Sequence, residues 1–344
     1  MRDHERSMSL VPYLHQVAAR ESLSAQQAHD AMTLLLEGGV PDALVAAFLV
    51  ALRMKGETAP ELAGFARAMR EHMVVVDAGP GVAEIVGTGG DAAGTFNIST
   101  VASLVLAGAG VPVAKHGNRA ISSRSGSADV LEALGVRIAM TPMEAAQAVR
   151  EIGLGFLFAP NLHPAMKNVQ GVRRELKMRT VFNLLGPLTN PAKAQTQVIG
   201  APSEEFAEVM AKALSLLGTG HSLVVHGQDG LDEVSITGPT HVFEVWTGRV
   251  EKCGWTPEDF GMTPAPLEVL AGGDATENAC ITLDILKGVK GPRRDVVLIN
   301  AAAGMFAAGR ASDPQSALAG AVESIDSGRA LGVLERLRRD FPAR

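Results

Sequence analysis

Cysteine and the larger aromatic residues are scarce in this sequence. Its 344 residues include 2 cysteines, 2 tryptophans and 1 tyrosine. Cys253 and Cys280 lie far apart and form no CxxC pair, which argues against a metal site or a disulfide framework. We therefore expect both thiols to be reduced in a cytoplasmic protein.

Long hydrophobic runs and an excess of basic residues are also missing. The longest apolar stretch, residues 101–114, contains Gly108, Gly110 and Pro112 and is too short to span a bilayer. The first residues lack the apolar core of a signal peptide. Lys and Arg number 31 against 37 Asp and Glu, a formal charge of −6, so no overall basic field attracts nucleic acid. We expect a soluble, cytoplasmic protein without a membrane or nucleic-acid partner.

Apolar residues, in contrast, make up 47% of the chain, and the first eighty residues arrange them in helical patterns. The capping boxes Ser24-x-x-Gln27 and Thr58-x-x-Glu61 predict two helix starts. The helix predicted from Pro41 is apolar on nearly every side, which is typical of a helix central to a bundle or pressed on another subunit. Because so small a helical domain has a marginal core, we expect it to dimerise or to be completed by a later segment.

From Val82 onward short β-branched runs alternate with helices, which is typical of a mostly parallel, doubly wound sheet. Residues 241–251 alternate and turn at Thr247-Gly248, which predicts a hairpin at the sheet edge. The last seventy residues are read as helices that cover the sheet. The other predicted strands are residues 84–86, 111–114, 137–139, 155–159, 196–199, 222–226 and 233–236.

One basic helical segment, residues 163–192, interrupts this alternation and ends in the breaker-rich stretch 185–191. We read it as an excursion that returns to the N-terminal helices. The predicted fold class is therefore α/β, with a small all-helical domain and a larger α/β domain around a mostly parallel central sheet. The predicted limits are 1–80, completed by about 164–190, for the first domain, and 81–163 with 191–344 for the second.

Two glycine-containing turns follow neighbouring predicted strands, where ligands of such sheets collect. The first is Gly87-Thr88-Gly89-Gly90-Asp91, with Thr95 and Asn97-Ile98-Ser99-Thr100 at the next helix start. The second is Lys115-His116-Gly117-Asn118-Arg119, before a serine-rich run that ends at Ser127. Tight turns and simple N-caps are the alternative interpretations. Glycines admit backbone N–H groups to an anion and helix starts favour negative charge, so both turns favour a phosphate or pyrophosphate site.

Three further features of the sequence each allow two interpretations. Asp232-Glu233 could bind Mg²⁺, with Ser99 as a further oxygen ligand, or form an exposed acidic turn. Arg173 could bind the carboxylate of a small substrate or remain a helix-surface charge. His163, before a proline, is either a structural histidine or a substrate contact. Asp129 is read as a favourable charge in the first turn of its helix.

Together these motifs resemble the anthranilate phosphoribosyltransferases, which join anthranilate to phosphoribosyl pyrophosphate (PRPP) in tryptophan biosynthesis. The resemblance runs nearly end to end, and its departures, Arg124 and residues 168–171, touch no assigned role. The motifs that carry it are GTGGD at Gly87, NIST at Asn97, KHGNRA at Lys115, SGSADVLEALG at Ser125, HPAMK at His163, RTVFNLLGPLTNP at Arg179, GLDEVS at Gly230 and GGDATENA at Gly272.

The resemblance implies a pentosyl transferase that is usually a homodimer through its helical domain. It implies anthranilate contacts from Gly87, Asn118 and Arg173, and two Mg²⁺ ions at Ser99, Asp232 and Glu233. No residue is assigned as acid or base, and Lys115, Arg119 and Arg173 act by positioning and charge stabilisation. The implied PRPP contacts are Gly87, Gly90, Asp91, Thr95, Asn97, Ile98, Ser99, Thr100, Lys115, His116, Gly117, Asn118, Arg119, Ala120, Ile121, Ser122, Ser123 and Ser127.

Two other functions stay open at this point. A pyrimidine nucleoside phosphorylase has the same general fold, but its glycine turn differs and it uses phosphate in place of PRPP. A non-catalytic relative would bind nucleic acid on the same scaffold, which the charge of −6 and the intact motifs disfavour.

Overall fold

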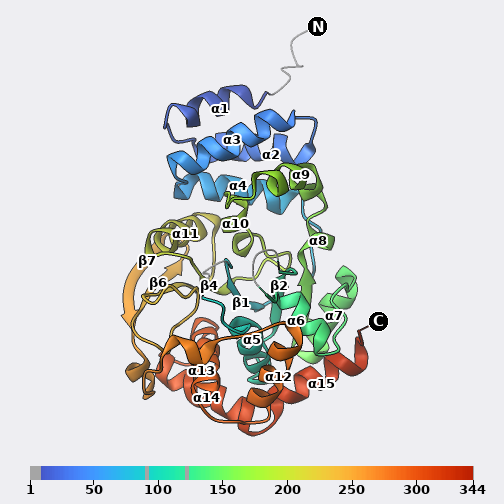
Figure 1. Cartoon of the computed structure of the whole chain (residues 1–344), viewed down its shortest axis with the longest axis vertical. Coiled ribbons are helices and arrows are strands. Elements are labelled where there is room, and N and C mark those ends of the chain that lie inside the picture. The colour runs from blue at the N-terminus through green and yellow to red at the C-terminus, as the bar shows by residue number, and fades with distance from the viewer. Residues whose placement is uncertain (1–8, 90–92, 121–123, 344) are drawn as a thin grey trace.

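The computed structural model describes residues 9–89, 93–120 and 124–343. Helices α1 to α4 stack at one end of the molecule, and the sheet with the C-terminal helices forms the other (Figure 1). The elements follow the chain as α1 (Val11–Ala18), α2 (Ala25–Glu37), α3 (Asp42–Lys55), α4 (Ala59–Glu71), β1 (Ala83–Gly87), α5 (Ile98–Gly108), β2 (Val113–Gly117), α6 (Ser127–Ala133), α7 (Pro142–Ile152), β3 (Leu154–Phe158), α8 (Ala159–Leu162), η1 (Pro164–Met166), α9 (Lys167–Leu176), α10 (Phe182–Leu185), η2 (Pro187–Thr189), β4 (Thr196–Gly200), α11 (Glu204–Leu217), β5 (Ser222–Gly227), β6 (Thr240–Trp246), β7 (Arg249–Trp255), η3 (Pro257–Phe260), η4 (Leu267–Leu270), α12 (Ala275–Leu286), α13 (Pro292–Ala307), α14 (Pro314–Asp326) and α15 (Arg329–Asp340).

The N-terminal helices begin where the sequence places capping residues. In α2, Ser24 Oγ accepts the Gln27 N–H, and the Gln27 side chain accepts the Ser24 N–H. In α4, the Glu61 carboxylate accepts the Thr58 N–H. Both predicted capping boxes are confirmed. The box at Ser24 binds two backbone N–H groups, and at Thr58 both the N–H and the hydroxyl donate to the Glu61 carboxylate.

Helix α3 packs against α1 and α9 and buries one face only. The buried side chains include Phe48, Leu49 and Leu52. On another face Met54 is 72% exposed. The apolar residues that the sequence places all around this helix are therefore only partly covered within one chain.

The basic segment after β3 returns to these helices. Helix α9 packs against α2 and α3, and α10 packs against α4. Val169, Val172, Phe182 and Leu185 join the same hydrophobic core as the buried residues of α2, α3 and α4. This contact agrees with the predicted excursion, while the limits of the two domains stay a prediction.

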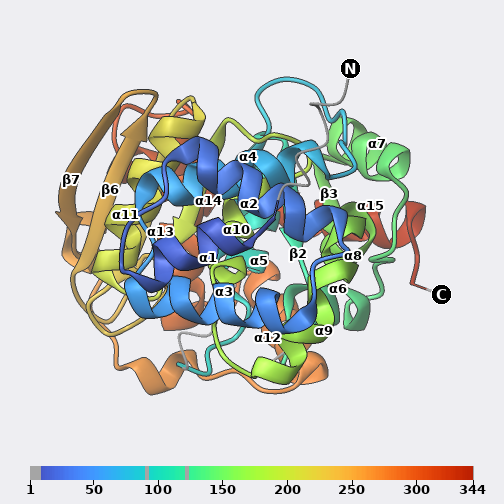
Figure 2. The ribbon, with the colours of Figure 1, turned by 90° about the horizontal axis from the view of Figure 1, so that it is seen from above.

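The seven strands form one sheet in the order β3-β2-β1-β4-β5-β6-β7. The first five strands of this order are parallel, and β6 and β7 are antiparallel. The predicted mostly parallel sheet is confirmed, as is the edge hairpin, which Figure 2 shows at one side of the molecule. Because β2 and β3 lie on one side of β1 and β4 on the other, the order reverses beside β1. Such a switch point opens a crevice where ligands bind.

The sheet is opened between β1 and β2, which pair at a single register position. Beyond it, side chains replace the ladder bonds. The Glu84 carboxylate accepts the His116 N–H at 3.1 Å, and Lys115 Nζ donates to the Ile85 carbonyl at 2.6 Å. Burial raises the pKa of Glu84 to about 7, although hydrogen bonds and the charge of Lys115 oppose this.

Two predicted strands were wrong. Residues 137–139 form no strand, because Arg137 donates to the Phe341 carbonyl and the neighbouring Val136 makes only an isolated bridge with Pro342. A short β-branched run has strand propensity, yet it becomes a strand only where a neighbour offers hydrogen bonds along its length.

The second wrong strand is residues 233–236. There the Asn300 side chain binds both backbone groups of Val234, and Thr240 Oγ1 accepts the Ser235 N–H. Side chains have thus taken the place of a neighbouring strand.

The C-terminal helices cover the sheet face opposite the helical end. Helix α13 packs against β1, β4 and α5, and α14 packs against α13 and α5. Within the part of the chain that the structure describes, no helix combines the length and apolar character needed to cross a membrane.

Candidate active site

The carboxyl ends of β1 and β4 leave room for Asp232 at the switch point. Gly87 and Gly200 are register partners at these ends. A Cβ on Gly87 would lie 2.5 Å from Asp232 Oδ2, and one on Gly200 would lie 1.6 Å from the Asp232 carbonyl oxygen. Only glycines at both positions let the loop of Asp232 pass so close to the strands.

The two adjacent carboxylates bind backbone N–H groups at the first glycine turn and the start of α5. Asp232 Oδ2 accepts the Gly89 N–H at 2.8 Å, and Glu233 Oε1 accepts the Ser99 N–H at 3.0 Å. Both acidic residues are less than a tenth exposed. The interpretation as an exposed acidic turn is therefore wrong, and the structure brings together the three predicted metal ligands.

Lys115 has a buried side chain that reaches Ser99 near the two carboxylates. Its Nζ donates to Ser99 Oγ at 3.1 Å. Burial lowers the pKa of Lys115, and the charges of Glu233, Glu84 and Asp232 oppose this by favouring the ammonium form. The positive charge of the ammonium group therefore offsets the negative charges of these carboxylates.

Asn97 joins the two glycine turns. Its Nδ2 donates to the Ser125 carbonyl, and its Oδ1 accepts from Asn278 Nδ2 on α12 at 2.9 Å. Ile98 and Thr100 follow in the first turn of α5 with buried side chains. Thr95 makes an isolated bridge with Ala271.

The second turn is folded around Asp129. Its Oδ2 accepts the N–H groups of Ala120 and Gly126, each at 2.9 Å. Asp129 is therefore more than a helix-dipole charge, because it brings the N–H groups of Ala120 and Gly126 to one carboxylate oxygen. Because Asp129 already accepts the Ala120 N–H, a PRPP contact with that N–H would compete with the Asp129 carboxylate.

Arg119 faces the acids of α6. Its guanidinium pairs with Asp129 at 3.0 Å and Glu132 at 2.8 Å, and these hydrogen bonds raise its pKa. Its side chain is 47% exposed. The predicted role in stabilising phosphate charge requires Arg119 to exchange these partners for the ligand.

Close packing fixes the rest of the second turn. A Cβ on Gly117 would lie 2.1 Å from Ser127 Oγ, so only glycine lets α6 begin at this distance. The Asn118 carbonyl accepts the Ala128 N–H, and its Oδ1 accepts the Arg119 N–H. Predicted PRPP contacts that lie outside the described residues are Gly90, Asp91, Ile121, Ser122 and Ser123.

Arg173 on α9 lies with its guanidinium carbon 5.0 Å from the centre of the Phe182 ring. Burial lowers its pKa. Within the described chain, the structure gives Arg173 no hydrogen bond with Gly87 or Asn118, the other predicted anthranilate contacts. Arg179, for which the sequence suggested no role, donates to the Gly89 carbonyl and links the basic segment to the first turn.

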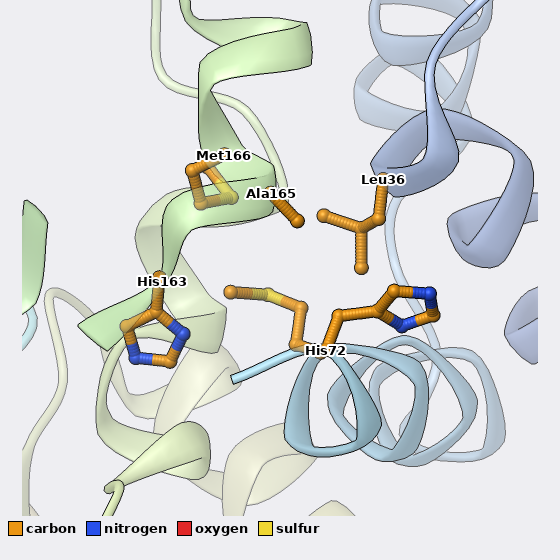
Figure 3. A pocket seen from close by; sticks show the side chains of 6 residues that line it. Leu36, His72, His163, Ala165 and Met166 are labelled. Carbon is orange, nitrogen blue, oxygen red and sulfur yellow. The ribbon is translucent and has the colours of Figure 1, made fainter. Parts of the chain in front are cut away.

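The rings of His116 and His163 lie with their centres 5.0 Å apart and their planes tilted by 47°. Burial lowers the pKa of His116 to about 3 and that of His163 to about 4, so both rings are neutral at pH 7. Both Nε2 atoms are buried without a hydrogen-bond partner in the described chain, and both interpretations of His163 stay open. His163 also borders a small pocket between α2, α4 and η1 that is too tight for water (Figure 3).

The residues around Ser99 fit a hard divalent cation. Two carboxylates and one hydroxyl meet there, and oxygen is the ligand atom that Mg²⁺ prefers. Across the described ranges, no three His, Cys, Asp or Glu side chains form a group that could hold a metal ion. Further ligands would have to come from water or from substrate phosphates, as is common for Mg²⁺.

Comparison with known proteins identifies a family for this chain. The helical bundle domain of a glycosyl transferase family matches residues 11–73, and the a/b domain of that family matches residues 79–331. The chain is 53% identical to the anthranilate phosphoribosyltransferase of Solibacter usitatus over 98% of this chain and 99% of that one. It is also 53% identical to that of Symbiobacterium thermophilum, over 94% of this chain and 96% of that one.

Solved structures give the same result. The anthranilate phosphoribosyltransferase of Thermus thermophilus superposes with a TM-score of 0.89 at 46% identity, covering 96% of this chain and 99% of that one. The Saccharomyces cerevisiae enzyme in complex with PRPP and Mg has a TM-score of 0.87 at 31% identity, covering 96% and 97%. Sequence and fold thus agree over both parts of the molecule, and the chain belongs to the anthranilate phosphoribosyltransferase family.

Proposed function

We propose that this chain transfers the 5-phosphoribosyl group of PRPP to the amine of anthranilate. The products are N-(5-phosphoribosyl)anthranilate and pyrophosphate, and the reaction is the second step of tryptophan biosynthesis from chorismate. The observation that carries the proposal is the meeting of Asp232 and Glu233 with the first glycine turn and the start of α5. The curated relatives have this activity in their names, and the yeast relative was solved with PRPP and Mg.

Ser99, Asp232 and Glu233 would bind two Mg²⁺ ions together with oxygens of the substrate pyrophosphate. When bound, Mg²⁺ neutralises the negative charge that grows on the departing pyrophosphate. The chain's own part is to keep the carboxylates in place, which the N–H groups of Gly89 and Ser99 do in the structure. Lys115 limits the repulsion between the buried acids.

PRPP would lie across both turns, bound by the residues that the sequence predicts. Of these, Gly87, Asn97, Ser99, Lys115 and Ser127 are the best supported, because the structure gathers them around the carboxyl ends of β1 and β2. Loss of pyrophosphate would leave positive character at the ribose carbon, as in other glycosyl transfers.

Anthranilate would be oriented through its carboxylate by Arg173 and Asn118, beside Gly87. A desolvated guanidinium on an aromatic ring is well suited to a planar carboxylate. The aromatic amine is a neutral nucleophile, so the main contribution of the protein is to position it. No side chain is needed as an acid or a base.

We also propose that the enzyme works as a homodimer through the helical domain, in the cytoplasm. The support for a dimer is the apolar surface of α3, where Ala43, Ala47 and Met54 are exposed. A second copy would cover that surface.

Mixing the folded protein with anthranilate, PRPP and Mg²⁺ tests the activity through the fluorescence of anthranilate. The proposal expects the fluorescence to fall as product forms and to stay constant when PRPP is left out. A constant signal with all three components present, together with turnover of thymidine and phosphate, would replace the proposal with a nucleoside phosphorylase.

A further inference from the structure

Asn300 lies on α13 with its side chain fully buried, and it makes three hydrogen bonds. Its Oδ1 accepts the Val234 N–H at 2.9 Å, and its Nδ2 donates to the Val234 carbonyl at 2.8 Å. Nδ2 also donates to the Val296 carbonyl, one turn earlier in the helix, at 2.8 Å. Two bonds to one residue are what a neighbouring strand provides, so the amide takes the place of a strand.

The residue bound in this way follows directly after Asp232 and Glu233. This loop belongs to no strand of the sheet, so ladder bonds do not fix it. From its other side, Asp229 accepts hydrogen bonds from the hydroxyls of Ser235 and Thr237. Those bonds shape the loop internally, and Thr240 Oγ1 at the start of β6 accepts the Ser235 N–H at 2.9 Å, which attaches this side of the loop to the sheet.

Helix α13 provides a second attachment, at Val234 beside Glu233. It packs against β1 and β4, whose ends hold Gly87 and Gly200, and against α5, whose first turn contains Ser99. The helix that carries Asn300 therefore packs on the two strands that hold Gly87 and Gly200 and on the helix that contains Ser99. A fixed distance from α13 to Val234 translates into a fixed distance from Glu233 to the start of α5.

We propose that Asn300 is a positioning residue for the Mg²⁺-binding carboxylates, a role that rests on the proposed function of Asp232 and Glu233. Asn300 touches neither carboxylate. It sets where their backbone lies, and so how well both point at one cation. Groups that orient metal ligands in this way affect metal affinity about 10–100-fold when they are lost.

The variant Asn300→Ser tests this role. A serine hydroxyl in a helix can bond the carbonyl one turn earlier, so the bond to Val296 is kept, while both bonds to Val234 are lost. Binding of Mn²⁺ in the presence of PRPP, followed by the electron paramagnetic resonance signal of free Mn²⁺, should weaken about tenfold or more. The Mg²⁺ concentration for half-maximal turnover should rise in parallel, while the KM for anthranilate stays at the wild-type value.

Asn300→Thr serves as the second variant if the serine form does not fold, because threonine makes the same helix bond and fills more of the space. The control is Ser324→Ala. It removes another fully buried hydrogen bond of the C-terminal helices, from Ser324 Oγ to the Val105 carbonyl at 2.7 Å. This control should lower the midpoint of thermal unfolding and leave Mn²⁺ affinity unchanged.

Wild-type Mn²⁺ affinity in a folded Asn300 variant would overturn the proposal. Equal weakening in Ser324→Ala would also overturn it, because the effect would then follow stability. If the wild-type protein itself binds no Mn²⁺ with PRPP and turns over no anthranilate, the proposed function fails, and that result is distinct from a failure confined to Asn300.

Discussion

At both glycine turns the backbone N–H groups are bound by carboxylates, yet the carboxylates come from different distances along the chain. At the first turn, Gly89 and Ser99 donate to Asp232 and Glu233, which lie 143 and 134 residues downstream. This arrangement exists only once β4, β5 and the loop after them have joined β1.

At the second turn the carboxylate is local. Asp129 binds Ala120 and Gly126, which lie nine and three residues before it. The carboxylate of the second turn therefore comes from the next helix start, and the carboxylates of the first turn come from the loop after β5. The comparison teaches that the same contact, a carboxylate on backbone N–H groups, is built from distant residues at the proposed metal site and from local residues at the proposed phosphate loop.

Removing the charge at the first turn should have the largest effect. Asp232→Asn keeps an oxygen for the Gly89 N–H but removes one of the two carboxylates that would bind Mg²⁺. We expect kcat/KM to fall about 10³-fold, since several kcal/mol of charge stabilisation would be lost. Steady-state fluorescence assays measure it. The exposed Asp284→Asn is the control, and a similar loss there would remove the special role of Asp232.

Arg173 belongs to neither turn, so its loss should leave both intact. Arg173→Ala should lower kcat/KM for anthranilate about 10²-fold, from the loss of a charge-assisted hydrogen bond to the substrate carboxylate. The KM for PRPP should not change. Its exposed neighbour Arg174→Ala provides the control, and if both variants behave alike, Arg173 does not contact anthranilate.

Acid should lower the free energy of unfolding, because His116 and His163 are buried in neutral form beside the second turn. Their folded-state pKa values lie below that of an unfolded histidine, so the stability they contribute is present above about pH 6.5 and is lost as pH falls. At pH 5 each should cost about 2 kcal/mol of the free energy of unfolding. Urea unfolding at pH 7 and at pH 5 measures the loss of free energy of unfolding between the two pH values. In His163→Asn this loss should be smaller by the about 2 kcal/mol that one histidine contributes. An unchanged difference would contradict a neutral His163.

The smallest effect should follow from the local carboxylate. Asp129→Asn keeps one acceptor for the N–H groups of the second turn but weakens both bonds, so the KM for PRPP should rise about tenfold while Mn²⁺ affinity is kept. Glu132→Gln weakens the two hydrogen bonds from Arg119 without touching the N–H groups of the second turn, so it should not raise the KM for PRPP. A loss of Mn²⁺ affinity in Asp129→Asn would show that the two turns are not separate.

Sequence patterns predicted the elements whose signals are local. Ser24 and Thr58 mark helix starts because each forms a capping box with the residue three positions later. The hairpin turn follows from the alternation of apolar and polar residues on both sides of Gly248. The proposed metal-binding pair is recognisable because Asp232 and Glu233 are adjacent in the chain.

Long-range partners leave no such pattern. Asn300 lies 66 residues from Val234, and Arg179 lies 90 residues from Gly89, so no spacing links them. Arg119 can pair either with a bound phosphate or with the acidic residues of α6, and the sequence alone does not predict which pair forms. Residues 137–139 have strand propensity, but only the folded chain shows that no strand lies beside them.

Mn²⁺ binding with and without PRPP tests the central interpretation of the first turn most directly. The chain offers two carboxylates and one hydroxyl, so we expect PRPP to tighten Mn²⁺ binding about tenfold or more in the wild-type protein and to have no such effect in Asp232→Asn. Equal Mn²⁺ affinity with and without PRPP, or a PRPP effect that survives in Asp232→Asn, would contradict a metal-assisted pyrophosphate site at this turn.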